Sequence, residues 1–297
     1  MSEFRKFIVP KKGHVFLEFD FKQLEVNALA EVTQCVQLIK ELNEGVDIHT
    51  RNAAEWKKIP ETTVDADTRT QAKVLTFQMQ YGAGNKSMAD FLGIPIKEVK
   101  LFKQAFFSRY PEIKQMHDEL NKWIRDLNSV SRDQGNLTIP VRSITNRLYK
   151  IKPRKDNYSD DSGDSKIYYS ATEAKNYPIQ GFGTGDLVPV AINMLYDLLD
   201  ESYFKTMVHD SLLLDISEKE VYTVLTAIEE VFYFLPMKFK ELFNYNLQVK
   251  YDYDISIGGT WKELKEPKHS YNRGDVIHIL KDQLILGESY DCYRYYN

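Results

Sequence analysis

Cysteine is scarce in this chain of 297 residues. The sequence holds two cysteines, Cys35 and Cys292, which are too few for a disulfide framework or a cysteine-rich metal site. Such scarcity is typical of proteins from a reducing compartment. We therefore expect an intracellular, cytoplasmic protein.

Long hydrophobic runs are also missing. No apolar stretch approaches the ~18 residues that a membrane-spanning helix needs. The first ten residues, MSEFRKFIVP, lack the apolar core of a signal peptide. We expect a soluble chain that begins at its own Met1 and has no membrane partner.

Positive charge is not in excess. Lysine and arginine number 39 against 43 aspartates and glutamates, which gives a formal net charge of −4. The chain as a whole is therefore not a basic nucleic-acid binder, and any such surface must be local. Hydrophobic residues make up 43% of the sequence, enough to fill the core of one large or two ordinary domains.

The pattern of apolar residues predicts a strand near the start of the chain and helices after it. A strand is expected at Val15–Phe19, followed by Asp20 and by a helix from Gln23. Further helices are expected at 65–80, at about 96–110 and at about 112–127. The segment 155–166 has almost no apolar residues and is expected to be a mobile insertion.

The last third of the chain mixes helices and strands. Helices are expected at 186–200 and at about 218–235, and a strand at 247–258. Between the two helices, TMVHDSLLLDI (206–216) predicts a hairpin with His209 and Asp210 at its tip. Strands at both ends of the chain with helices between them predict an α+β sheet domain that is interrupted by a helical insertion.

Asp20 and Asp210 form a predicted carboxylate pair. Each lies at the end of a predicted strand, and adjacent strands of one sheet would bring the two carboxylates close together. Such carboxylates repel each other unless cations lie between them. Hard oxygen ligands with open positions suit two Mg²⁺ ions that activate an attacking and a leaving oxygen. The alternative is that each aspartate merely ends its strand.

The helix at 65–80 carries a stripe of residues spaced by four: Arg69, Lys73, Phe77 and Tyr81. This spacing places them on one face, with cations toward the N-terminal end and aromatic rings toward the C-terminal end. Such a face matches a nucleoside triphosphate, because the cations would bind the phosphates and the base would stack near the rings. An amphipathic helix with two solvated cations and two core aromatics is the alternative.

Several motifs occur together, and they resemble the signature motifs of family A DNA polymerases, the class of bacterial DNA polymerase I. They are DFKQLE (20–25), the stripe at 69–82, NYPIQG (176–181) and VHD (208–210). DIH (47–49) and GGTWKELK (258–265) are also similar to the family, so the resemblance covers most of residues 4–265. Four coordinated motifs make a specific signature.

The resemblance implies a polymerase palm, an antiparallel sheet with helices, interrupted by a helical fingers subdomain. We expect palm at 1–45, fingers at 46–184, palm again at 185–265 and a C-terminal extension at 266–297. Nineteen residues precede Asp20, so the thumb and exonuclease domains of the family are expected to be absent. This predicts one chain of a split phage polymerase, acting in the host cytoplasm, whose partner polypeptide supplies a thumb and a 3′-5′ exonuclease. An engineered fragment is the alternative.

The resemblance also implies a reaction, which is DNA-directed synthesis of DNA from deoxynucleoside triphosphates on a primer-template. Asp20, Asp210 and the backbone carbonyl of Phe21 would hold two Mg²⁺ ions, and Lys73 would protonate the departing pyrophosphate. The implied nucleotide-binding residues are Arg69, Lys73, Phe77, Tyr81, Gln23, Glu25 and His49. The implied DNA-binding residues are His209, Asn176 and Gln180. For Asn176 and Gln180 the alternative is a turn before Pro178.

Four positions depart from the family pattern. Ser211 stands where the family has glutamate, Gln78 where it has glycine, and Thr70 and Thr172 where it has arginine. The substitution at 211 removes a carboxylate beside Asp210.

Two other functions follow from these departures. His-Asp-Ser also resembles a motif of single-subunit phage and mitochondrial RNA polymerases, so an RNA polymerase fragment is one alternative. Glu25, which would obstruct a ribose, argues against it. A catalytically degenerate structural subunit of a replication complex is the other alternative, against which the intact metal-binding and phosphate-binding residues argue.

Overall fold

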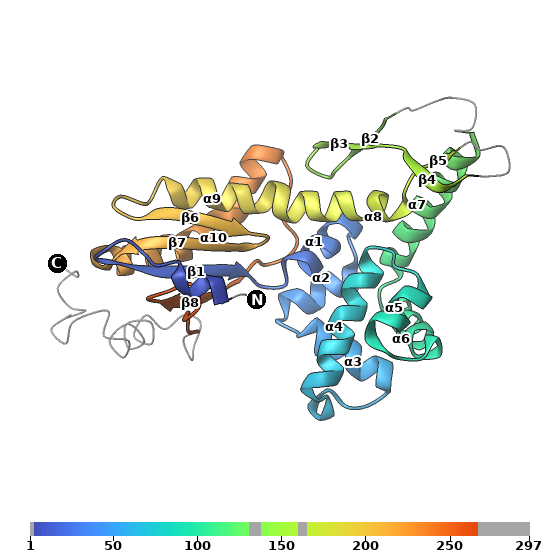
Figure 1. Ribbon diagram of the computed structural model, residues 1–297, viewed down its shortest axis with the longest axis horizontal. Coiled ribbons are helices and arrows are strands. Elements are labelled where there is room, and N and C mark those ends of the chain that lie inside the picture. Colours follow the sequence, from blue (N-terminus) through green and yellow to red (C-terminus); the bar gives the residue numbers. More distant parts are fainter. Residues whose placement is uncertain (1–2, 131–137, 160–164, 267–297) are drawn as a thin grey trace. The chain divides into compact units, whose positions relative to one another are not determined.

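The computed structural model describes residues 3–130, 138–159 and 165–266. These residues divide into two compact units (Figure 1). The first unit takes residues 3–24, 187–242 and 251–266, and the second takes 25–186 and 243–250 within the described ranges. The predicted C-terminal extension lies outside the described residues except for Glu266. No helix among the described residues combines the length and the apolar character that a membrane span requires.

A four-stranded antiparallel sheet forms the centre of the first unit. Its order is β6 (Tyr203–Val208), β7 (Ser211–Ser217), β1 (His14–Phe21) and β8 (Tyr253–Gly258). A strand from the start of the chain thus lies between two strands from its last third, which confirms the expectation that strands at both ends share one sheet. Asp20 of β1 pairs with Ser211 on one side and with Asp254 on the other.

The two faces of this sheet differ because side chains alternate along each strand. Phe19 and Phe21 contact Phe232 of α10 (Val221–Phe243), with ring centroids 6.2 and 4.8 Å apart. Glu18 and Asp20 point to the opposite face, where they line a polar hollow. The unit also contains α9 (Val188–Tyr196) and short 3₁₀ turns at Glu3–Phe7 and Glu218–Glu220.

The second unit is built mainly from helices. In chain order they are α1 (Leu24–Thr33), α2 (Val36–Asn43), α3 (Ile48–Lys57), α4 (Ala66–Gln80), α5 (Asn85–Leu92), α6 (Ile96–Arg109), α7 (Pro111–Val130) and α8 (Ala171–Gln180). A π-helix at Gly181–Leu187 follows α8. Two hairpins complete the unit, β2 (Ile139–Arg142) with β3 (Leu148–Ile151), and β4 (Arg154–Ser159) with β5 (Ser165–Tyr168).

The predicted helices at 65–80, 96–110 and 112–127 are confirmed as α4, α6 and α7. The helix predicted from Gln23 is broken in two, because Gln34 has φ 51° and ends α1 before α2 begins. The helices α3, α5 and α8 and the strands β2 to β5 were not predicted. The segment 155–166 contributes to strands β4 and β5, and its residues 160–164 lie outside the described ranges.

Two buried carboxylates tie α1 and α2 to the second unit, which begins at residue 25. The palm and fingers boundaries stay predictions. Glu31 of α1 is fully buried and accepts hydrogen bonds from the backbone N–H groups of Gln248 (2.7 Å) and Val249 (2.9 Å). Glu41 of α2, also buried, accepts from Arg109 and from the Tyr110 hydroxyl (2.7 Å). Both carboxylates therefore find their partners within the second unit.

Replacing Glu41 by Gln tests this attachment. Burial alone would raise the pKa of Glu41, but hydrogen bonds from Arg109 and Tyr110 hold it below its ordinary value. Breaking one partner of a buried pair leaves the other charge uncompensated, so Glu41→Gln should lower the free energy of unfolding by ~3 kcal/mol at pH 7. Denaturant titration measures this loss.

The same variant has a defined pH dependence. Because the folded pKa of Glu41 lies below the unfolded one, its stabilisation is present above the unfolded pKa and is lost as pH falls through the folded pKa. The difference between the wild type and Glu41→Gln should therefore shrink on acidification. Glu44→Gln, which alters an exposed carboxylate 3.9 Å from Lys40, should change stability by less than ~0.5 kcal/mol. Equal losses in both variants would contradict the assignment.

Candidate functional site

The hairpin tip between β6 and β7 brings Asp210 to Asp20. Val208 pairs with Ser211, so His209 and Asp210 form the turn, and His209 has φ 60°, which few non-glycine residues adopt. The backbone N–H of Phe21 donates to the carbonyl oxygen of Asp210 at 3.4 Å. The side chains of Asp20 and Asp210 lie close enough for the negative charge of Asp210 to raise the pKa of Asp20. The two aspartates singled out in the sequence therefore meet in the structure.

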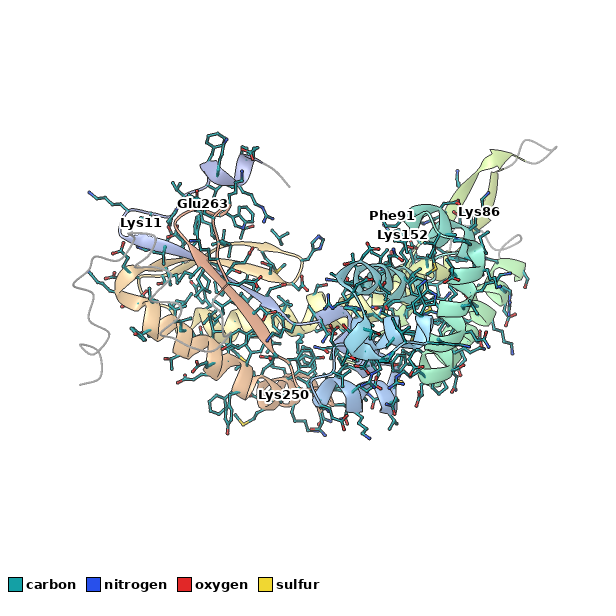
Figure 2. The ribbon with its side chains drawn as sticks, turned by 90° about the horizontal axis from the view of Figure 1, so that it is seen from below. Lys11, Lys86, Phe91, Lys152, Lys250 and Glu263 are labelled. Carbon is teal, nitrogen blue, oxygen red and sulfur yellow. The ribbon has the colours of Figure 1, made fainter. Side chains whose placement is uncertain are left out.

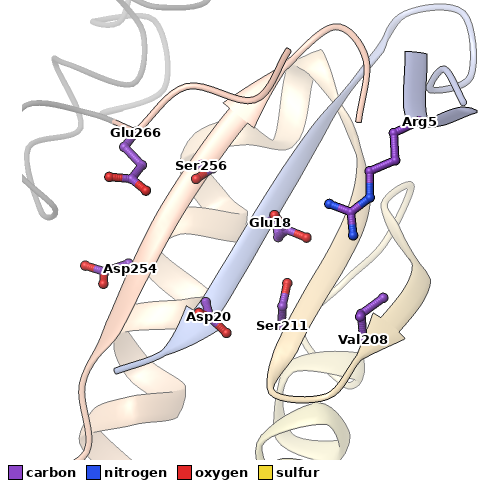
Figure 3. Close-up of a pocket in the computed structure, with 8 residues that line it drawn as sticks. All are labelled: Arg5, Glu18, Asp20, Val208, Ser211, Asp254, Ser256 and Glu266. Carbon is purple, nitrogen blue, oxygen red and sulfur yellow. The ribbon is translucent and has the colours of Figure 1, made fainter. Parts of the chain in front are cut away.

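Further acidic side chains surround Asp20 on the same face of the sheet (Figure 3). Glu18 precedes it by two residues on β1, and Asp254 lies opposite it on β8. A hollow of about 270 Å³ is lined by Arg5, Glu18, Asp20, Val208, Ser211, Asp254, Ser256 and Glu266. Glu18 and Asp254 were not predicted as site residues, although polar residues at a spacing of two mark one face of each strand.

The electrostatics of this face are dominated by like charge. The pKa of Asp20 is raised to about 7, first by burial and then by the negative charges of Asp210, Glu18 and Asp254. Lys22 offsets part of this charge through ion pairs with Asp252 (3.3 Å) and Asp254 (3.1 Å). A cation at Asp20 and Asp210 would therefore relieve repulsion that is built into the sheet.

The ligand set of this face suits a hard cation. No cluster of three or more His, Cys, Asp or Glu side chains with metal-binding geometry occurs in the part of the chain that the structure describes. The available ligands are the two aspartate carboxylates and backbone oxygen at the end of β1, such as that of Phe21. Mg²⁺ uses one or two carboxylates and keeps waters and substrate oxygens in its remaining positions, so the residues fit this ion.

Ser211 occupies the place beside Asp20 on β7 (Figure 3). Its hydroxyl oxygen is buried and has no hydrogen-bond partner among the described residues. An unpaired buried hydroxyl is unfavourable and marks a position that a ligand or water can satisfy. Ser211 therefore presents an unpaired hydroxyl to the hollow.

The predicted stripe on α4 lies on the less buried face of the helix. Asp65 caps the helix by accepting from the backbone N–H of Thr68 at 2.7 Å. The buried residues of α4 are Ala72, Leu75, Thr76, Met79 and Gln80. Arg69, Phe77 and Tyr81 are half-buried and Lys73 is exposed. The stripe is therefore not the core face of α4, which disfavours the alternative of two core aromatics.

Asp47 and His49 complete a cluster with this stripe. Asp47 caps α3 and accepts a 2.6 Å hydrogen bond from Nε of Arg69. The ring of His49 meets that of Phe77 edge-on at 5.5 Å, and Nζ of Lys73 lies 5.8 Å from the centre of the Phe77 ring. Arg69, Lys73, Phe77 and His49 are thus together in the second unit. The contact of Asp47 with Arg69 was not predicted, although Asp47 belongs to the DIH motif (47–49).

Burial and neighbouring charged side chains determine the protonation of His49 and Asp47. Burial lowers the pKa of His49 to about 4, and the positive charges of Lys73 and Arg69 act in the same direction. Burial would raise the pKa of Asp47, but hydrogen bonds from Arg69 and Thr50 lower it to about 2. At neutral pH His49 is therefore uncharged, and Asp47 is a carboxylate that pairs with Arg69.

The remaining predicted residues lie in both units. Gln23, in the first unit, has φ 50° and a buried side-chain oxygen without a hydrogen-bond partner among the described residues. Glu25 lies in the first turn of α1, where its carbonyl oxygen accepts from Nε2 of Gln80 at 3.3 Å. Asn176 and Gln180 lie within α8, so the alternative of a turn before Pro178 is wrong. The side-chain oxygen of Asn176 is also buried without a described partner.

Comparison with known proteins identifies relatives of this chain. A family model described as DNA polymerase family A matches residues 1–263. DNA polymerase I of Caldicellulosiruptor bescii is 32% identical over 220 residues, which cover 73% of this chain and 24% of the relative. The thermostable DNA polymerase I of Thermus aquaticus is 26% identical over 266 residues, covering 88% of this chain and 29% of the relative. The chain thus spans about a quarter of the length of these relatives.

A solved structure shares the fold. The POL domain of Pol1 from M. smegmatis, in complex with DNA primer-template and dNTP, matches 86% of this chain with a TM-score of 0.64 and 22% identity. The match covers 42% of that domain's chain. It confirms the predicted arrangement of an antiparallel sheet with helices and an inserted helical region.

A thermal-shift experiment tests the carboxylate pair as a cation site. Without a divalent cation, Asp210→Asn should raise Tm, because it removes the repulsion between Asp210 and Asp20. Saturating Mg²⁺ should stabilise the wild type by ~1–3 kcal/mol, through binding to the folded state alone, and should not stabilise the variant. Asp200→Asn, at an exposed carboxylate of the same unit, should behave as the wild type. The same Mg²⁺ increment in Asp210→Asn would contradict the site.

Proposed function

Because the chain belongs to DNA polymerase family A, we propose that it carries out template-directed DNA synthesis from deoxynucleoside triphosphates. The observation that supports this most strongly is the meeting of Asp20 and Asp210 at one end of the sheet, inside an acidic hollow. The solved relative that shares the fold was determined with DNA primer-template and dNTP, which supports the same partners here. The predicted partner polypeptide with a thumb and a 3′-5′ exonuclease, the split gene and the phage origin stay predictions.

Asp20 and Asp210, with the backbone carbonyl of Phe21, are the proposed ligands of two Mg²⁺ ions. When bound, such ions supply activation of a primer 3′-hydroxyl and neutralisation of the triphosphate. The contribution of the chain is to hold two carboxylates at a fixed separation, through the β1–β7 register and the hydrogen bond from Phe21 to Asp210. His209, in the strained turn, is proposed to contact the primer.

The α4 cluster is proposed to bind the nucleoside triphosphate. Arg69 and Lys73 would contact the phosphates, and Arg69 would exchange its ion pair with Asp47 for a phosphate oxygen. Lys73 is also the proposed proton donor to the departing pyrophosphate. His49 adds no charge because it is neutral, and its buried Nδ1 has no hydrogen-bond partner among the described residues. The imidazole therefore has a free position for a phosphate contact.

The aromatic end of the stripe and two further residues are proposed to select the nucleotide. Phe77 and Tyr81 would stack near the base, and Gln23 would contact the triphosphate. Glu25 would lie under the sugar and exclude a 2′-hydroxyl. Asn176 and Gln180 of α8 are proposed to touch DNA, for which the unpaired side-chain oxygen of Asn176 leaves an acceptor.

Primer extension with Mg²⁺ tests the assignment of roles. Asp20→Ala and Asp210→Ala should reduce extension to background, because each removes a proposed metal ligand. Lys73→Ala should slow nucleotide addition by ~10²–10⁴-fold, the usual contribution of a general acid. Lys86→Ala, at an exposed lysine of α5, is the control and should retain activity. Activity that survives Asp210→Ala would overturn the metal assignment, and a wild type that stays inactive with any partner chain would favour a structural subunit.

Competition between deoxynucleotides and ribonucleotides tests the role of Glu25. The wild type should prefer deoxynucleotides, and Glu25→Ala should reduce that preference by at least about tenfold, equivalent to ~1.4 kcal/mol of discrimination. Single-nucleotide incorporation with dNTP and rNTP measures both rates. Equal use of the two by the wild type would support the RNA polymerase alternative.

A further inference from the structure

A second polar pocket lies in the second unit, beside the turn that ends α4. Its volume is about 290 Å³, at the lower end of the range for small-molecule sites. The lining residues are Met79, Gly82, Ala83, Lys103, Phe107, Lys114, His117, Asp118, Asn121 and Lys175. None of them is a residue to which the proposed polymerase reaction assigns a role.

Lys175 of α8 is the unusual residue of this pocket. Its side chain is buried, with 5% of the residue exposed, and it makes no ion pair or hydrogen bond with any described residue. Lysine is almost never buried without a partner, because desolvation of the ammonium group is costly. Its Nζ lies over Gly82, where an added Cβ would come within 2.8 Å of it, and Gly82 has φ 78°. The turn after α4 therefore needs glycine for its backbone conformation, and Nζ of Lys175 lies directly above it.

Burial and the charge of Lys103 lower the pKa of Lys175, and the carboxylate of Asp118 offsets this only in part. Lys103 donates a 3.0 Å hydrogen bond to the carbonyl oxygen of Ala83, and has no carboxylate partner among the described residues. Lys114 is paired with Asp118 at the exposed rim. His117 is buried, and burial with the charges of Lys175 and Lys103 lowers its pKa to about 4, so it is neutral. Lys103 and Lys175 therefore place two ammonium groups in one small cavity, and neither has an ion-pair partner among the described residues.

The uncharged residues that line the pocket suit a nucleotide of a nucleic-acid strand. The half-buried ring of Phe107, which meets the ring of His117 at 5.6 Å, offers an aromatic surface. Asn121 adds an amide that can donate and accept hydrogen bonds. Aromatic rings beside a positively charged groove are the usual means by which proteins bind single-stranded nucleic acid.

We propose that the pocket between Lys103 and Lys175 binds a phosphate group of single-stranded nucleic acid, with an adjacent base against Phe107. The ammonium groups of Lys103 and Lys175 contact the phosphate oxygens, which offsets the burial of Lys175. The binding is independent of the cation site at Asp20 and Asp210. Only the choice of a nucleic-acid strand as the source of the phosphate rests on the proposed function.

Equilibrium binding of a fluorescein-labelled oligodeoxythymidylate, without divalent cations and at several salt concentrations, tests the proposal. Lys175→Met and Lys103→Met should each weaken binding about tenfold at low salt, and each should reduce the slope of log K against log salt by ~0.7, the contribution of one phosphate contact on a single strand. Asp118→Asn should strengthen binding, because it removes the one carboxylate among the lining residues. Unchanged affinity and slope in both lysine variants would overturn the proposal.

The controls separate the pocket from general charge and from folding. Lys86 and Lys152 are exposed lysines on the surface of the same unit (Figure 2), so Lys86→Met and Lys152→Met should weaken binding less than twofold. Lys175→Met removes a buried charge and should not lower Tm. Equal losses at the pocket and surface lysines would overturn the proposal.

Two further arms identify the source of the phosphate and keep the test distinct from polymerase activity. Inorganic phosphate and dTTP should compete with the oligonucleotide only weakly. Competition as strong as that of an unlabelled oligonucleotide would overturn the assignment to a strand. Asp20→Ala should retain the full oligonucleotide affinity of this pocket, so a failure of the proposed polymerase reaction would leave this result unaffected.

Discussion

Repulsion between Asp20 and Asp210 is the constraint on which the first unit depends. The sheet holds the two carboxylates together through the β1–β7 register and through the backbone hydrogen bond from Phe21 to Asp210. On the opposite face, Phe19 and Phe21 pack against Phe232, so burial of aromatic surface fixes the strand that carries Asp20. The packing energy of the apolar face thus offsets the repulsion between the two carboxylates on the polar face. A cation bound between Asp20 and Asp210 would relieve that repulsion.

Negative charge around Asp20 comes from Asp210 of the motif hairpin and also from β1 and β8, at positions outside the motif. Ser211 on β7 carries no charge, whereas Glu18 on β1 and Asp254 on β8 both raise the pKa of Asp20. A glutamate at position 211 would add a further carboxylate to a hollow that already contains several. The serine is therefore compatible with a cation site, because the acidic field does not depend on that position.

The sequence predicted those features that follow from local spacing and missed those that depend on distant partners. Short apolar runs were sufficient for β1 and the hairpin, and helix start and stop signals were sufficient for α4. The break after α1 was missed because Gln34 adopts φ 51° in a segment with helical spacing. The helix α8 was missed because proline usually ends a helix, yet here α8 passes through Pro178 and continues into a π-helix. Asp254 was missed because nothing local shows which strand lies beside β1.

The second unit shows how an acidic chain can have local positive charge for binding phosphate. A chain with a net charge of −4 does not attract nucleic acid as a whole. Cations nevertheless gather at both ends of α4, with Arg69 and Lys73 toward its start and Lys103 and Lys175 beside the turn that ends it. Burial strengthens their effect, since Lys175 and Lys103 lie in a cavity with little competing carboxylate. Phosphate recognition therefore requires only a few desolvated cations beside one helix, and the acidic residues elsewhere on the surface do not oppose it beyond the range of screening.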